Sequence, residues 1–117
     1  MAPTIQTGGM ARVVLITAPN EAVARQLARA MVEQRLVACV NLLPGVSSIY
    51  RWEGQVEEES EVLLVVKTAA ARLDELARFV LAEHPYDQPE FVALAPEAVE
   101  SGYLAWLLAE SAPPAAD

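Results

Sequence analysis

The chain has 117 residues, a length that fits a single domain with its own hydrophobic core. Its hydrophobic share of 54%, charged share of 21% and net charge of −8 are typical of a globular protein, and its dispersed basic residues exclude a nucleic-acid or anionic-membrane surface. The single cysteine excludes an intrachain disulfide framework, and no apolar run approaches the roughly 20 residues needed to cross a bilayer, so we expect a cytoplasmic protein.

The first half of the chain begins with a segment, residues 1–10, that we expect to be a flexible leader to a domain spanning 11–111. The apolar, β-branched run Arg12–Ala18 does not alternate, which is typical of a strand covered on both faces. Asn20 is a good helix cap and precedes a helix predicted over Glu21–Arg35. The predicted apolar face of this helix comprises Val23, Leu27, Ala30 and Met31.

A long hairpin follows. Val37–Leu43 is strand-like, and Pro44-Gly45 predicts a bulge or bend rather than an end to the strand, which continues over Val46–Glu53. Glu53-Gly54 predicts a tight turn, after which the return strand runs to Thr68.

The second half begins with a helix predicted over Ala69–Glu83, because Pro85 disfavours helical geometry at the residue before it. A strand over Glu90–Ala95 and a helix over Gly102–Glu110, capped by Ser101, complete the domain. The tail, residues 112–117, is expected to be disordered. The predicted buried stripe of the second helix comprises Leu73, Leu76, Ala77, Val80 and Leu81.

The predicted order β-α-β-β-α-β-α indicates an α+β, ferredoxin-like sandwich with an additional C-terminal helix. Right-handed crossovers place the first two helices on one face of a four-stranded sheet, so the other face needs the third helix or a partner subunit to cover it. Tyr50 and Trp52 lie on the projecting hairpin, where aromatic side chains are typical of an interface between subunits.

A metal site is one hypothesis for the polar residues. Cys39 and His84 cannot complete a zinc site alone, although a carboxylate such as Glu83 could add an oxygen ligand, and thiolate with imidazole favours copper or zinc. The alternatives are that Cys39 is a small buried apolar residue and that His84 is favoured by the dipole at the end of its helix.

Other charged residues have similarly open interpretations. Lys67 could bind an anionic ligand in a cleft or pair with a carboxylate such as Glu90. The acidic run Glu57–Glu61 is interpreted as a solvated hairpin arm, because adjacent side chains of a strand point to opposite faces. No nucleophile elbow, phosphate loop or paired histidine motif is present, so we expect no enzyme.

The most specific motifs are ACVNLLPGVSSIYRWEG, the pair Lys67-Thr68, and HPY with Pro89-Glu90. With the flanking sequence from Val13 to Leu108, they resemble the CutA family, which is named for divalent-cation tolerance. The resemblance implies a ferredoxin-like protomer, a homotrimer built by strand pairing, an architecture similar to PII signal proteins, and a link to copper or other divalent cations without an established reaction.

One departure from the family pattern concerns copper. Members linked to copper have a cysteine at the position of Ile16 and a His-His pair where this chain has Glu83-His84, so only His84 of that set is present. Two functions follow as hypotheses. The first is a non-enzymatic trimer in divalent metal tolerance, binding a cation weakly near His84. The alternative is a PII-like sensor with a ligand between subunits near Lys67, Tyr86 and Glu90.

Overall fold

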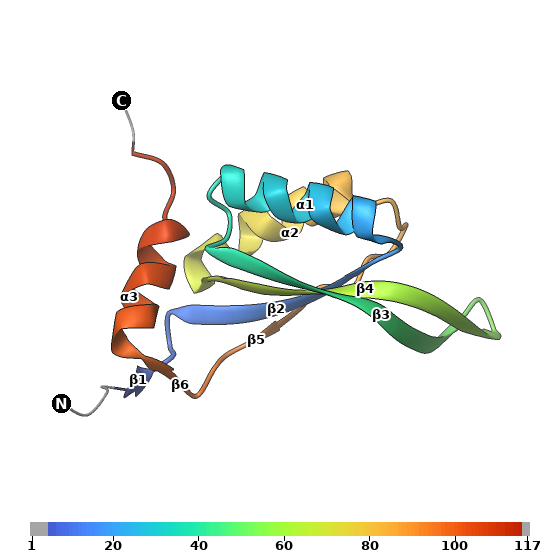
Figure 1. Ribbon diagram of the computed structural model, residues 1–117, viewed down its shortest axis with the longest axis horizontal. Coiled ribbons are helices and arrows are strands. Elements are labelled where there is room, and N and C mark those ends of the chain that lie inside the picture. Colours follow the sequence, from blue (N-terminus) through green and yellow to red (C-terminus); the bar gives the residue numbers. More distant parts are fainter. Residues whose placement is uncertain (1–4, 116–117) are drawn as a thin grey trace.

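The computed structural model describes residues 5–115, and Figure 1 shows two helices above a twisted sheet with a third helix at its end. The elements are β1 Ile5–Thr7, β2 Ala11–Ala18, α1 Glu21–Glu33, β3 Cys39–Trp52, β4 Gln55–Ala69, a 3₁₀ turn Ala70–Arg72, α2 Leu73–Glu83, β5 Val92–Leu94, β6 Ala98–Glu100 and α3 Ser101–Glu110.

The main sheet has four strands in the order β3-β4-β2-β5, and every neighbouring pair is antiparallel. The predicted α+β class with an antiparallel four-stranded sheet is therefore confirmed. Alternate residues of β2 and β4 are buried and form the core with α1 and α2. The buried strand residues of this core are Val14, Ile16, Ala18, Val62, Leu64 and Val66.

The opposite face of the sheet is only partly covered. Ala11 and Ala38 pack there with Leu104 and Leu107 of α3, in a second, smaller cluster. Farther along, the same face exposes the large side chains of Leu43, Val92 and Leu94. This face is the apolar surface that the sequence predicted to need a cover.

The long hairpin has the predicted irregularities. The pairing register of β3 and β4 shifts between Leu43 and Val46, so Pro44-Gly45 forms a bulge, and Gly45 has a φ of 74° that suits glycine. At the tip, Glu53 and Gly54 have φ values of 50° and 80°, which is the backbone of a two-residue hairpin turn.

Both ends of the chain differ from expectation. Ile5–Thr7 pairs antiparallel with Ala98–Glu100, so this part of the predicted leader 1–10 is a strand, and β6 was not predicted at all. At the other end, the carbonyl of Ala112 accepts a hydrogen bond from Arg35, which ties down the start of the predicted tail. Residues 1–4 and 116–117 of these predicted segments lie outside the described residues.

Several boundaries also differ. The last strand of the main sheet is confined to Val92–Leu94, and the second helix begins with a 3₁₀ turn before Leu73. Leu81, predicted to be buried, is 63% exposed, because α2 packs through the side of Leu76 and Val80. The side chain of Glu100, rather than that of Ser101, caps α3 by accepting from the amide of Tyr103.

The end of α1 explains why the predicted helix is too long. The amide of Leu36 donates to the carbonyl of Met31, and the amide of Arg35 donates to that of Val32, which is a Schellman motif. Arg35 therefore sits at the left-handed position, with a φ of 58°, where glycine is usual.

The side chain of Arg35 compensates for this strained backbone. Its guanidinium donates to the carbonyls of Ala109 and Ala112, at 2.7 Å and 3.0 Å, and lies 3.8 Å from the carboxylate of Glu110. Arg35 thus caps the C-terminus of α3 and fixes it to the turn that follows α1.

We expect Arg35→Ala to destabilise the chain by about 1–2 kcal/mol, because it loses charge-assisted hydrogen bonds while keeping the left-handed backbone. Arg35→Gly should cost less, since glycine removes a backbone penalty of about 1 kcal/mol. Urea unfolding measures the difference, and amide exchange should show α3 opening faster in both variants. Equal unfolding midpoints for the two variants would contradict the predicted strain at Arg35.

Candidate functional site

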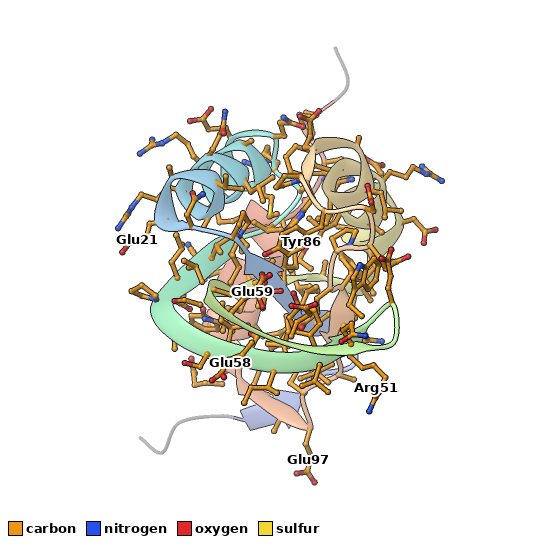
Figure 2. All side chains as sticks on the ribbon, turned by 90° about the vertical axis from the view of Figure 1, so that its right-hand side faces the viewer. Glu21, Arg51, Glu58, Glu59, Tyr86 and Glu97 are labelled. Atoms are coloured by element: carbon orange, nitrogen blue, oxygen red, sulfur yellow. The ribbon has the colours of Figure 1, made fainter. Side chains whose placement is uncertain are left out.

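A groove of about 920 Å³ lies between the hairpin arm, formed by the outer parts of β3 and β4, and the loop that joins α2 to β5. Figure 2 looks onto the end of the molecule where the arm and this loop lie. The carboxylates that line the groove are Glu57, Glu59, Glu61, Asp87 and Glu90, and its aromatic residues are Tyr50, Trp52 and Tyr86. None of the lining residues is basic.

The pleat of β4 brings three of these carboxylates together. Glu57, Glu59 and Glu61 are spaced by two residues, so they share one face of the strand, whereas Glu58 points away (Figure 2). Adjacent carboxylates of this run point apart, as predicted, but the convergence of the alternate ones was not predicted. The signal was present as a period of two in the run 57–61.

Glu61 is the most buried of these acids, with a relative exposure of 7%. The hydroxyl of Tyr86 donates to its carboxylate at 2.8 Å, which links the loop to the arm. A buried carboxylate needs such a partner, because an unpaired charge away from water is costly.

His84 holds the same loop from the other side. Its Nε2 lies 2.7 Å from the carbonyl of Thr17, and its Nδ1 accepts from the amide of Tyr86 at 3.1 Å. This network assigns the proton to Nε2, so both ring nitrogens of the buried imidazole are engaged. In this arrangement His84 positions Tyr86 and offers no free nitrogen to a metal ion.

Burial, together with the accumulated negative charge, raises the pKa of three groups that line the groove. Burial raises the pKa of Tyr86 well above its usual range, and the hydrogen bond to Glu61 adds to the effect. Desolvation, followed by repulsion from Glu59, raises the pKa of Tyr50. Burial and the nearby charge of Glu61 raise the pKa of the Glu90 carboxyl. A bound cation would relieve this repulsion.

The predicted metal ligands do not converge within one chain. Cys39 pairs with Lys67 in the β3–β4 ladder, and its sulfur lies 3.8 Å from the hydroxyl of Tyr103. His84 instead lies beside Thr17, about 13 Å farther along the sheet at the usual rise per residue. Glu83, at the end of α2, is exposed. Within residues 5–115, no group of three or more His, Cys, Asp or Glu side chains could hold a metal ion.

The predicted ligand cleft is only partly assembled. Tyr86 and Glu90 both line the groove, but Lys67 does not. The ammonium of Lys67 donates to the side-chain oxygen of Asn41. Lys67 itself lies six residues along β4 from Glu61. At the usual rise of a strand, that separation is about 20 Å, so within one chain Lys67 lies apart from the groove that Tyr86 and Glu90 line.

Tyr50 and Trp52, the predicted interface aromatics, are 38% and 46% exposed on the arm. Their outward position leaves apolar surface available to another molecule, and their role at an interface stays a prediction. No helix in the described part of the chain is long and apolar enough to cross a membrane.

Comparison with known proteins gives consistent matches. The family model described as "CutA1 divalent ion tolerance protein" matches residues 12–110. The divalent-cation tolerance protein CutA of Thermus thermophilus is 53% identical over 98 residues, which are 84% of this chain and 95% of that protein. Protein CutA of Mus musculus is 46% identical over 85% of this chain, which spans 56% of that protein. The solved structure of CutA from Synechococcus elongatus has a TM-score of 0.88 at 36% identity, covering 93% and 96% of the two chains.

We expect Glu90→Gln to raise the melting temperature at pH 7.5. Because the pKa of Glu90 is raised in the folded chain, the folded state keeps its proton to higher pH than the unfolded chain, and ionised Glu90 opposes folding. This gain should shrink as the pH falls through the raised pKa and vanish below the ordinary value of 4.5.

Thermal unfolding, measured in steps of about one pH unit from pH 4 to pH 8, tests this effect. Glu97→Gln is the matched control, since Glu97 points into solvent away from the groove (Figure 2). A gain that is equal for both variants, or that persists at low pH, would contradict the role of burial at Glu90.

Proposed function

The chain belongs to the CutA1 divalent ion tolerance family, and on this premise we propose that it contributes to divalent metal tolerance as a non-enzymatic homotrimer that binds cations weakly. The single observation that carries the cation-binding part is the groove lined by five carboxylates and no basic side chain. Such a groove concentrates divalent cations by its electrostatic potential.

The proposed cation is Cu²⁺ before Zn²⁺, attracted by the summed charge of the groove, since no three His, Cys, Asp or Glu side chains of residues 5–115 are placed to hold an ion together. Carboxylate and hydroxyl oxygens bind both ions, and affinity at a given site follows an order in which Cu²⁺ exceeds Zn²⁺. The raised pKa of Glu90 supports binding here, because a cation stabilises the ionised carboxylate that the groove otherwise disfavours. The set of Cys39, Glu83 and His84 is less well supported, since His84 would first have to give up a hydrogen bond.

The proposed trimer follows from the uncovered sheet face. Three aliphatic side chains on this face are each about half exposed, namely those of Leu43, Val92 and Leu94. The indole of Trp52, on the hairpin arm, is exposed to a similar extent. Burying such surface against sibling copies releases roughly 25 cal/mol per Å² of apolar area. Strand pairing between copies would also satisfy the outer edges of the sheet.

A PII-like sensor is the weaker alternative. It requires Lys67 to face Tyr86 and Glu90, and one chain separates Lys67 from that groove. Only a second copy could supply the lysine. We also propose a cytoplasmic location, which the free thiol of Cys39 supports, because free thiols are typical of reducing compartments.

Titration calorimetry with Cu²⁺ and Zn²⁺ tests the groove. We expect Glu57→Gln/Glu59→Gln to weaken Cu²⁺ binding about fivefold, from two lost interactions of roughly 0.5 kcal/mol each. The control Glu53→Gln/Glu58→Gln removes the same two charges from the same hairpin, but neither residue lines the groove.

His84→Gln separates the groove from the alternative ligand set, since a glutamine amide can still donate to the carbonyl of Thr17. Equal affinities in the groove variant and its control would reject the groove as the site. Loss of binding in His84→Gln alone would support the set of Cys39, Glu83 and His84 instead.

Light scattering tests the assembly independently. We expect a mass of three copies at micromolar concentration, and smaller species for Leu94→Asp, because a buried unpaired carboxylate would oppose association. Leu81→Asp is the control, with a leucine that is also exposed but lies on α2. A single-copy mass for the folded wild-type protein would refute the trimer.

A further inference from the structure

Three carboxylates of the groove form a row with regular spacing along β4. Glu57, Glu59 and Glu61 all line the groove, and successive members are two residues apart on the strand. At the usual rise of a strand, the row therefore has a period of about 7 Å. The ligands of a chelated metal ion all lie within about 2.5 Å of it, so the three acids do not converge on one ion. The row instead offers separate positions to successive positive charges.

The acids of the groove have no cationic partner within the described part of the chain. The arginine ion pairs of these residues involve four acids, namely Glu21, Glu33, Glu75 and Glu110. None of those four acids lines the groove.

Glu61 adds a specific need for a hydrogen-bond donor. It is only 7% exposed, and one of its carboxylate oxygens accepts from the hydroxyl of Tyr86. Its other oxygen has no hydrogen-bond partner among residues 5–115, although it is not sealed from water. Leaving such an oxygen without a donor is costly, and a ligand in the groove can supply one.

The remaining walls of the groove favour an organic cation. Tyr50 is the cross-strand partner of Glu57, so its ring lies beside one end of the row. Trp52, Pro85 and Tyr86 add further carbon surface to the walls. Aromatic faces attract ammonium groups within about 6 Å and also pack against methylene groups. Acids and aromatic rings together recognise a cation that carries both charge and a hydrocarbon chain.

We propose that the groove binds a linear aliphatic polyamine, with successive ammonium groups on Glu57, Glu59 and Glu61 and the methylene chain against the ring of Tyr50. A fully extended chain advances about 1.2 Å per bond, so ammonium groups joined by four methylenes lie about 6 Å apart, close to the period of the row. The inference rests on the cation-binding groove of the proposed function and names an organic class of cation for it.

Binding at this row is compatible with assembly by strand pairing. Pairing between copies at the outer edge of β3 uses backbone groups that lie in the plane of the sheet, whereas the carboxylates of the row project from its face.

Titration calorimetry with metal-free protein tests the proposal at about 0.15 M salt, where charges more than about 8 Å apart are largely screened. The probe is homospermidine, a triamine with two four-carbon spacers. The reference is hexaamminecobalt(III), a compact cation of the same charge. We expect homospermidine to bind about tenfold more tightly, because only the extended cation spans the row and offers methylene groups to the rings.

Two pairs of variants locate the site. Glu59→Gln, in the middle of the row, should weaken homospermidine binding about fivefold. Its control is Glu58→Gln, which removes the same charge from the neighbouring residue that points away from the groove, and should bind normally (Figure 2). Tyr50→Leu should weaken binding about threefold, whereas Tyr50→Phe should not, because the ring face rather than the hydroxyl attracts the ammonium group.

Equal affinities of the wild-type protein for the two trivalent cations would overturn the match of spacing. Equal affinities of Glu59→Gln and Glu58→Gln for homospermidine would reject the row as the site. Absence of homospermidine binding at millimolar concentration, in a protein whose Cu²⁺ binding still weakens in Glu57→Gln/Glu59→Gln, would reject the polyamine and leave the proposed function intact. Loss of that Cu²⁺ dependence alone would instead reject the metal part of the proposed function.

Discussion

The pleat of β4 is the constraint on which the rest of the structure depends. Along its inner half, every second residue, such as Leu64, packs under the helices. Along its outer half, where β2 no longer pairs with it, the carboxylates Glu57, Glu59 and Glu61 face the groove. A slip of one residue would exchange the two faces and place charge in the core, so the packing of the core also fixes the position of the acids.

The groove has a second wall because a buried histidine holds the loop after α2. His84 bridges the carbonyl of Thr17 and the amide of Tyr86, and Tyr86 reaches across to Glu61. The three contacts join the end of β2, the loop and the arm, so the loop cannot move without disturbing a buried hydrogen bond. His84, a predicted candidate metal ligand, thus holds the loop that forms one wall of the carboxylate groove.

Much of the fold could be predicted because its signals are local. The proline and glycine of the bulge and the capping Asn20 act within a few residues, and each was placed correctly. Arg35 was misplaced in the helix because its left-handed backbone is stabilised by carbonyls 74 and 77 residues away. The strand Ala98–Glu100 was missed because it is three residues long and exists only through its pairing with β1.

The candidate site illustrates the same division between local and distant information. The alternation that aligns Glu57, Glu59 and Glu61 is written in the sequence, but the loop that faces them comes from 25 residues farther along the chain. The net charge contains even less information about where the charges lie. A value of −8 does not reveal that acids line one groove while Arg25 and Arg29 line another, between α1 and β3. Since electrostatic attraction weakens strongly beyond a Debye length of about 8 Å in physiological salt, each groove acts on partners through its own local charge.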